Sequence, residues 1–398
     1  MATVTKCEFL VVGGGISGIT AAIQAARTGL STILVEREMF LGGNSSCQLG
    51  VLSAGALNCN EYVSEAGIIG EIQERFSFYR ARSGMAMSTL NPVVDQILWD
   101  LLDEAAVTVF NRHLLLDVNT EEDRITSVCL LNIENLNEFR VETGGFIMDA
   151  TGDAHVACKA GAEVMIGRES KFDTGERCAR EQADSVVSAA SVVALVAKTE
   201  SPSEFIPPPG TPKWNPEKPT SAFCPERGFS ALFQADLGGA DDALHPLKTP
   251  QRLHRELVKY IFSMWDYLKN VKYRDEAKNH RLIWISPVLG RRESNRIRGD
   301  YVLTQTDIET NRTFPDAVAF GGFNLDEHLP SLDGGYEVRF HSHPRPYDIP
   351  FRCLYSRNMK NLFAGGRAVS MTHMALMSVR VVQTLSSLAQ AAALAAKL

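Results

Sequence analysis

The first forty residues constrain the fold of this chain more than any other stretch. A short apolar run, Glu8 to Val12, ends in the glycine-rich turn Gly13-Gly14-Gly15-Ile16-Ser17-Gly18. An alanine-rich segment follows up to Gly29, and a second apolar run from Thr32 ends in the acid Glu36. Strand, glycine turn, helix, strand and acid in this order predict a βαβ unit that binds a dinucleotide. The alternative is a glycine turn in an ordinary βαβ unit.

The glycines of this turn have separate physical roles. Gly13 permits the tight turn after the strand, Gly15 lets the backbone approach a pyrophosphate, and Gly18 lets the helix pack closely on the sheet. The phosphates are expected at the helix N-terminus, beside Ser17, because free N–H groups and the helix dipole favour negative charge there. Glu36 stands where an acid is expected to meet a ribose hydroxyl.

The segment after Glu36 favours FAD over NAD. Arg37 follows the acid, and Gly42-Gly43-Asn44-Ser45 comes shortly afterwards. This arrangement resembles the flavoproteins that have the FAD fold of the glutathione-reductase type. In that group an acid, a basic or polar residue and a Gly-Gly pair run along the adenosine and pyrophosphate. The resemblance implies cofactor contacts for Arg37, Gly43, Asn44 and Ser45.

Two later stretches extend the resemblance. An apolar strand runs into Asp149-Ala150-Thr151-Gly152, which resembles the second flavoprotein signature, an Ala-Thr-Gly beside the FAD. Asn361 to Ala364 leads into Gly365-Gly366-Arg367, like the strand that ends beside the ribityl chain and phosphates. The resemblance implies FAD contacts for Ala150, Thr151, Gly152, Gly366 and Arg367. It also implies a long helix from about His373 whose N-terminus points at the flavin.

Taken together, the chain resembles the FAD-dependent oxidoreductases that have one dinucleotide domain and no separate NAD domain. We find no second GxGxxG. Four stretches carry the resemblance: the N-terminal GGGISG with Glu36 and GGNSS, DATGDA at 149–154, GRRESNRIRGDYVLTQTD at 290–307, and PYDIPFRCLYSRNMKNLFAGGRAVSMTHMALMSVR at 346–380.

The predicted fold class is α/β: a Rossmann-like FAD-binding domain with a β-meander, plus an inserted α+β substrate domain. The FAD-binding domain is expected to be discontinuous, at 1–162 and 345–398, with the inserted domain at 163–344. Residues 201–219 are rich in proline and predict an irregular loop. The other expected elements are helices at 67–82, from 92 onward, 154–160 and 249–280, and strands at 107–110, 114–119, 125–132, 138–142, 145–148 and 282–285.

Bulk properties limit the partners. The chain has 398 residues and a net charge of −7 without a long basic run, which argues against nucleic acid. No apolar run reaches the length of a bilayer, so no membrane partner is expected. The lack of a signal-peptide pattern predicts a cytoplasmic protein with reduced cysteines. Ala396-Lys397-Leu398 resembles the peroxisomal Ser-Lys-Leu address and leaves that compartment open for a eukaryotic source. A homodimer is left open.

Candidate catalytic residues follow from the chemistry of flavin. Oxidation of a C–H bond needs a base, and His373, just after the glycine pair, is the first candidate; His343 is another. Arg292 is a candidate for holding a substrate carboxylate or the charge of a reduced ring, and Tyr347 for donating to a substrate oxygen. Each has a structural alternative, an ion-paired turn for Arg292 and a core position for Tyr347. No metal is expected, because no acid or cysteine is spaced to complete a set with the histidines. Cys47 has no partner at CxxxxC spacing, which argues against a dithiol mechanism.

The leading functional hypothesis is therefore hydride transfer between FAD and a small organic substrate, by an oxidase or dehydrogenase with oxygen or NAD(P) as acceptor. Two alternatives stay open: a reductase that draws electrons from NAD(P)H, and a flavoprotein with a non-redox or vestigial flavin.

Overall fold

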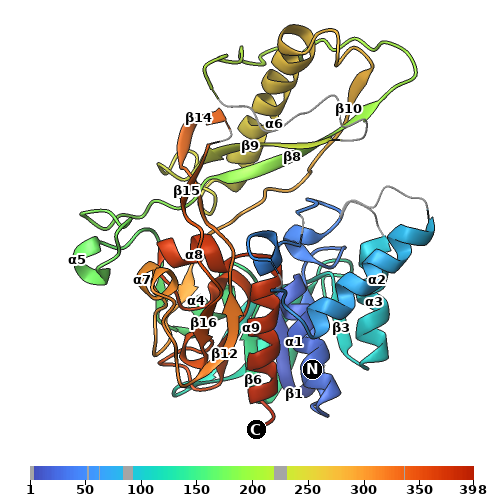
Figure 1. Ribbon diagram of the computed structural model, residues 1–398. Helices are drawn as coiled ribbons and strands as arrows, with labels where there is room; N and C mark the ends of the chain where they lie inside the picture. The colour runs from blue at the N-terminus through green and yellow to red at the C-terminus, as the bar shows by residue number, and fades with distance from the viewer. Residues whose placement is uncertain (1–3, 52, 62, 84–92, 219–230, 336) are drawn as a thin grey trace.

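The computed structural model describes residues 4–51, 53–61, 63–83, 93–218, 231–335 and 337–398. They form a lower body, which contains both described ends of the chain, and an upper body around β8, β9, β10 and α6 (Figure 1). No described helix is both long enough and apolar enough to span a bilayer. The fold is a mixed α/β architecture, as predicted.

The predicted βαβ unit forms the centre of the lower body. Strand β1 (Val4–Val12) is followed by α1 (Ile16–Arg27) and β2 (Thr32–Glu36), and β1 pairs with β2 in parallel, with Val12 opposite Val35. Except for Val4 at the start of β1, the apolar residues of both strands are buried, since parallel strands are covered on both faces. The N-terminal prediction is confirmed.

This unit is part of a seven-stranded sheet. Six of the strands follow the order β3-β2-β1-β6-β5-β4, and the seventh, β17, pairs with β6. Glu138–Glu142 and Gly145–Met148, predicted as two strands, form one long strand, so that prediction was wrong. One half of β6 pairs with β5 and the other half pairs in parallel with β17, so both halves have partners and the strand continues. These strands are β3 (Thr108–Asn111), β4 (His113–Glu121), β5 (Arg124–Asn132), β6 (Glu138–Asp149) and β17 (Leu362–Ala364).

The helix predicted to start at about His373 is broken in two. Helix α8 (His373–Val379) ends at Arg380, and α9 (Val382–Ala395) begins after Val381, whose extended backbone caps it. The Arg380 side chain donates to the Asp326 backbone oxygen and carboxylate, each at 2.9 Å, and this fixes the break. Helix α9 packs on α1. The predicted start of the helix from 92 onward lies outside the described residues. The remaining helices of the lower body are α2 (Ile68–Ser83), α3 (Val93–Glu104), α4 (His155–Ala160) and α7 (Gln305–Glu309).

The upper body is an antiparallel sheet, in the order β10-β8-β9-β14, covered by helix α6 (Pro250–Asp266). Leu253, Leu257, Ile261 and Trp265 of α6 are fully buried, as their helical spacing predicted. Residues 201–218 contain no helix or strand. The other bounds are β7 (Val164–Met165), α5 (Lys171–Thr174), β8 (Ala190–Lys198), β9 (Ala231–Gly238), β10 (His280–Ile285), β11 (Arg296–Ile297), β12 (Ala317–Gly321), β13 (Leu325–His328), β14 (Ser331–Gly335), β15 (Val338–Ser342) and β16 (Tyr347–Pro350).

Two hydrophobic clusters correspond to these two bodies. The upper cluster draws its buried residues from the range 190–277. The lower cluster includes Ile297, Leu303, Phe314 and Leu325 together with residues of the βαβ unit. The predicted domain limits at 163 and 344 stay a prediction, and part of that range packs with the lower body.

Candidate active site

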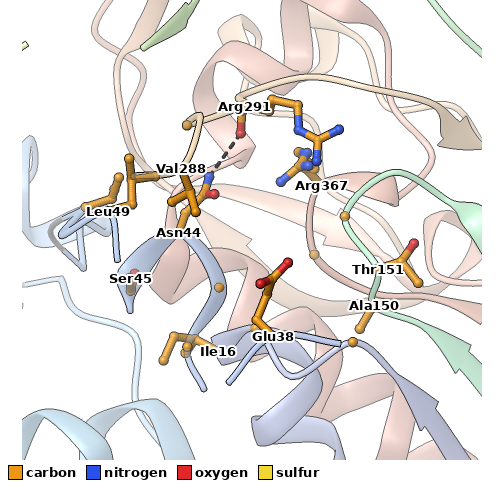
Figure 2. A pocket seen from close by; sticks show the side chains of 18 of the residues that line it. Ile16, Glu38, Asn44, Ser45, Leu49, Ala150, Thr151, Val288, Arg291 and Arg367 are labelled. Atoms are coloured by element: carbon orange, nitrogen blue, oxygen red, sulfur yellow. Dashed lines mark hydrogen bonds between the residues drawn. The ribbon is translucent and has the colours of Figure 1, made fainter. Parts of the chain in front are cut away.

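One large cavity, of about 1090 Å³, lies between the lower and upper bodies. We refer to it as the main cavity. It extends from the glycine turn and Glu36 to residues of β8, β13 and the 287–292 segment. Figure 2 shows Asn44, Arg291 and Arg367 around this space. Every residue predicted to bind the cofactor lines it: Gly13, Gly15, Ser17, Gly18, Glu36, Arg37, Gly43, Asn44, Ser45, Ala150, Thr151, Gly152, Gly366 and Arg367.

The glycine turn has the geometry that its residue types require. Gly13 has a φ of +114°, and a Cβ there would lie 2.2 Å from the Ala150 oxygen. A Cβ on Gly18 would lie 2.0 Å from the Gly13 oxygen, so this glycine is needed for the close packing of α1. At Gly15, by contrast, a Cβ would have no other atom within 4 Å. The turn is therefore closed on the protein side and open on the cavity side.

The carboxylate of Glu36 ties the glycine turn to the segment that follows β2. Gly14 N–H donates to Oε2 at 2.5 Å, and Glu38 N–H donates to Oε1 at 2.7 Å. Burial raises the pKa of Glu36, and these two backbone donors oppose the rise. The side chain is therefore positioned by the backbone before any ligand is bound.

The polar groups beside the glycine turn are suited to bind the pyrophosphate of a dinucleotide. No side chain caps the N-terminus of α1 at Gly15, so its first N–H groups face the cavity. Ser45 Oγ and Arg367 Nε are buried and have no hydrogen-bond partner in the described part of the chain. A hydroxyl, a guanidinium Nε–H and the first N–H groups of a helix are suitable donors for phosphate oxygens. The residues present therefore fit FAD.

Asp153 places two arginines at this cavity. Its carboxylate lies 2.6 Å from Arg291 Nη1 and 2.7 Å from Arg367 Nη2. Burial would raise the pKa of Asp153, but Arg367 and Arg291 together hold it below its ordinary value. Asn44 Nδ2 donates to the Arg291 backbone oxygen at 3.0 Å, which ties the Gly-Gly loop to the same segment (Figure 2).

A second polar cluster lines the main cavity on the side of the upper body. Asp236 of β9 accepts hydrogen bonds from Ser191 Oγ and from His328 Nδ1, the latter at 2.5 Å. Arg292 Nη1 donates to Ser191 Oγ at 2.6 Å and to the Ala189 oxygen at 3.1 Å. This cluster therefore holds an arginine and a histidine on one buried aspartate.

The protonation states in this cluster follow from burial and charge. Burial would raise the pKa of Asp236, but Arg292 and His328 keep it below its ordinary value, so Asp236 is ionised. Burial, and next the charge of Arg292, lower the pKa of His328 to about 4. His328 is therefore neutral near pH 7. Its Nδ1–H donates to Asp236, and Nε2 is the nitrogen that can accept a proton.

The predicted catalytic residues are not brought together. Arg292 lines the main cavity, whereas His373, His343 and Tyr347 do not. His373 is buried beside Glu293, and His343 is exposed, with Nδ1 2.6 Å from Asn324 Oδ1. Tyr347 is a core residue whose hydroxyl lies 2.7 Å from Ser378 Oγ, and burial raises its pKa. Their catalytic roles stay predictions.

Sequence reasoning missed His328, Asp326 and Arg380, which line this cavity, and Asp236, which is bonded to His328. Asp326 and His328 are separated by one residue on β13, so both side chains fall on the same face of the strand. This alternation was a usable signal in the sequence. Asp236 had none, because its contact with His328 depends on how distant strands approach each other.

Of the two helices that follow the Gly365-Gly366 pair, α9 rather than α8 begins at the main cavity. Val381 and Val382 line this cavity, whereas His373 at the start of α8 lines a different one. His373 begins a helix, as predicted. That this helix N-terminus faces the flavin stays a prediction.

A glycine turn that fits a pyrophosphate, in a Rossmann-like sheet beside an Ala-Thr-Gly segment, defines an FAD-binding protein. The chain belongs to the family FAD dependent oxidoreductase, whose model matches residues 8–398. FAD is accordingly its cofactor, and the protein is an enzyme. Compartment and oligomeric state stay predictions.

Individual relatives match only parts of the chain. Thiamine thiazole synthase of Desulfosudis oleivorans is 31% identical over 39% of this chain and 60% of its own length. Digeranylgeranylglycerophospholipid reductase 2 of Methanothermobacter thermautotrophicus is 28% identical over 40% of this chain and 43% of its own. A geranylgeranyl bacteriochlorophyll reductase-like structure from Thermoplasma acidophilum has a TM-score of 0.47 and 13% identity, covering 99% of this chain and 78% of that one. The chain spans less than two thirds of the length of the two curated relatives.

Proposed function

We propose that this enzyme transfers a hydride between FAD and a small organic substrate, in an FAD fold of the glutathione-reductase type. The main cavity carries this proposal, because the cofactor residues and the cluster of Arg292 and His328 line one continuous space. A cofactor cradle that opens onto titratable side chains is the usual arrangement of a catalytic pocket. Residues 163–344 would supply the substrate side of that space.

The cofactor half of the proposal assigns binding roles. Glu36 would hold the adenosine ribose, and the N-terminus of α1 with Ser45 and Arg367 would hold the pyrophosphate. When bound, FAD supplies the site that accepts or donates the hydride. Asp153 keeps Arg367 oriented, because its buried carboxylate forms an ion pair with the partly buried guanidinium.

The substrate half assigns roles to Arg292 and His328. Ser191 and the Ala189 oxygen hold the guanidinium of Arg292 in one orientation, where its charge can bind an anionic oxygen of a substrate. His328 is neutral near pH 7 and would accept the substrate proton at Nε2. Asp236 stabilises the imidazolium that results, since its carboxylate is bonded to Nδ1.

The test is to watch the visible flavin band of the purified FAD-loaded protein without oxygen. Organic donors that carry an oxidisable C–H bond next to an oxygen or nitrogen are added first, and NADPH and NADH are added to parallel samples. Bleaching by an organic donor supports an oxidase or dehydrogenase, and His328→Gln should slow this bleaching by about 10²-fold or more. Bleaching by NADPH or NADH alone would identify a reductase instead. A flavin that no donor reduces would contradict the proposal.

A further inference from the structure

The segment 290–295 runs from the upper body to the lower body and is bonded to both. Gly290 pairs with Ser191 of β8, and each backbone N–H donates to the oxygen of the other residue, at 2.8 and 2.9 Å. At the far end of the segment, Ser294 Oγ donates to the Gly152 oxygen at 2.5 Å. The residues between these two anchors therefore follow a fixed course from the upper sheet to the Ala-Thr-Gly segment.

Arg291 lies between these anchors, and its guanidinium lines the main cavity (Figure 2). The side chain is 22% exposed, and Nη1 lies 2.6 Å from Asp153 Oδ2. Its Nε and Nη2 make no hydrogen bond to any residue that the structure describes. Sequence reasoning did not place this arginine among the cofactor contacts, yet these two nitrogens are available to a ligand in the main cavity.

A short series of contacts places Arg291 beside the N-terminus of α1. The Arg291 backbone oxygen accepts from Asn44 Nδ2 at 3.0 Å. The neighbouring Gly43 approaches the glycine turn, because a Cβ on Gly43 would lie 3.1 Å from Gly15 Cα. Figure 2 shows Arg291 and Ile16, the first residue of α1, around the same space. This is the space in which the pyrophosphate is expected.

Two guanidiniums share one carboxylate at this position. Arg291 and Arg367 each form an ion pair with Asp153, whereas the nearby Arg37 and Glu38 pair with each other. Burial lowers the pKa of Arg291, and the charge of Arg367 adds to this fall, although Asp153 opposes it. One positive charge is therefore left over among these five residues, and an anion beside the two guanidiniums would balance it.

We propose that Arg291 donates to an oxygen of the FAD pyrophosphate, so that the cofactor is held by both bodies of the protein. A planar guanidinium with two unused nitrogens suits a phosphate oxygen better than a single point charge does. The proposal rests on the pyrophosphate site proposed above, but not on the substrate or the direction of the reaction. Bound FAD would then also fix the segment that carries Arg292, the next residue along the chain.

The test displaces FAD from the FAD-loaded protein with two probes, ADP, which carries a pyrophosphate, and adenosine, which carries none. The fluorescence of the released FAD gives a dissociation constant for each probe. The ratio of the adenosine constant to the ADP constant then reports the phosphate contacts alone. Arg291→Met should lower this ratio by about ten-fold or more, because it removes charge-assisted hydrogen bonds. Damage to the fold would weaken both probes and leave the ratio unchanged.

Two further variants complete the test. Arg298→Met removes an exposed arginine shortly after the segment, outside the main cavity, and should leave the ratio unchanged. Arg367→Met should lower the ratio, as the proposed pyrophosphate site requires. A ratio that falls in Arg367→Met but not in Arg291→Met would overturn the role of Arg291 alone. A ratio that falls in neither variant would overturn the pyrophosphate site as well.

Discussion

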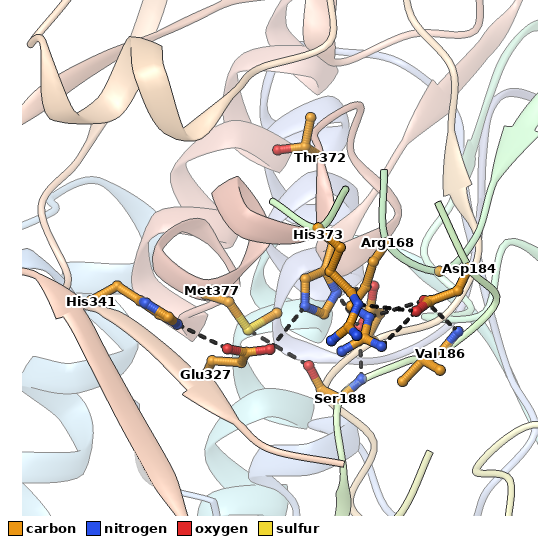
Figure 3. A network of polar contacts seen from close by, with 12 residues as sticks. Arg168, Asp184, Val186, Ser188, Glu327, His341, Thr372, His373 and Met377 are labelled. Atoms are coloured by element: carbon orange, nitrogen blue, oxygen red, sulfur yellow. Dashed lines mark hydrogen bonds and ion pairs between the residues drawn. The ribbon is translucent and has the colours of Figure 1, made fainter. Parts of the chain in front are cut away.

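Glu327 and His328 are consecutive residues of β13, and their side chains line different cavities. The same strand therefore carries, on one face, a carboxylate ion-paired with the protonated His373 (Figure 3) and, on the other, the neutral His328. Burial lowers the pKa of His328 to about 4, whereas the glutamates around His373 raise its pKa to about 9. The two pKa values shift in opposite directions because burial and the charge of Arg292 prevail at His328, whereas Glu293 and Glu327 prevail at His373.

The cofactor site should depend strongly on Glu36. Glu36→Gln removes the charge that accepts from Gly14 N–H and Glu38 N–H. We expect FAD to bind about ten-fold to 100-fold more weakly, which corresponds to roughly 1.4–3 kcal/mol. Fluorescence titration of the apoprotein with FAD measures this. Glu38→Gln is the control, since Glu38 lines the same cavity but pairs outward with Arg37. Equal effects of the two variants would argue against the role of Glu36.

The packing of α1 on the sheet should not tolerate a methyl group at Gly18. A Cβ there lies 2.0 Å from the Gly13 backbone oxygen, so Gly18→Ala must move the helix or the turn. We expect a loss of about 1–3 kcal/mol in the free energy of unfolding, together with weaker FAD binding. Gly70→Ala is the matched control in helix α2, where nothing lies within 4 Å of the new methyl. It should be neutral or slightly stabilising, and chemical denaturation distinguishes the two.

The pH dependence of flavin reduction should report His328. With a pKa of about 4, His328 is protonated only in acid, so the reduction rate should fall as the pH drops towards 4. Arg292→Met removes a charge that lowers this pKa, and the acid limb should move up by about one pH unit. Stopped-flow reduction over pH 4–8 measures both curves. An unmoved acid limb in Arg292→Met would exclude His328 as the titrating base.

The free energy of unfolding should fall as the pH rises above 6.5, because His373 loses its proton in the folded protein. Its pKa is about 9 in the folded protein and about 6.5 in an unfolded chain, so its protonation stabilises the fold fully below pH 6.5. This contribution is lost as the pH rises from 6.5 through 9, and its size is on the order of 3 kcal/mol. His373→Asn should be less stable than the parent at pH 6.5 and should flatten the dependence up to pH 9. Denaturant titrations at several pH values test this. His343→Asn, at an exposed site, should keep the parent slope.

The cofactor half of the site could be predicted from the sequence because its residues are local. Gly13 to Gly18 adopt their turn through backbone sterics, and Glu36 reaches that turn because β1 and β2 are adjacent and parallel. The Ala150-Thr151-Gly152 segment follows β6, which is the next strand of the same sheet. Each of these positions follows from chain order and short connections.

The substrate half could not be predicted in the same way. Asp236 and His328 are 92 residues apart and lie on strands that do not pair with each other. Their contact depends on how the upper body sits on the lower one, which periodicity does not encode. The break between α8 and α9 was missed for a related reason. The break after α8 is fixed by the bond from Arg380 to Asp326, a contact between distant segments.

The pairing of β17 with β6 has a consequence for how the protein is made. Leu362 of β17 lies opposite Ile147 of β6. After β6 has been made, the ribosome must therefore translate a further stretch of more than half of the chain before β6 gains this neighbour. At roughly 5–20 residues per second, a nascent chain spends about ten seconds or more with that edge uncovered. The edge presents Ile147 and Met148, both fully buried in the finished fold. Protection of this edge by a chaperone, or its aggregation in the absence of one, is therefore expected during synthesis. A ribosome-bound chain stalled before Leu362 should fail to retain FAD.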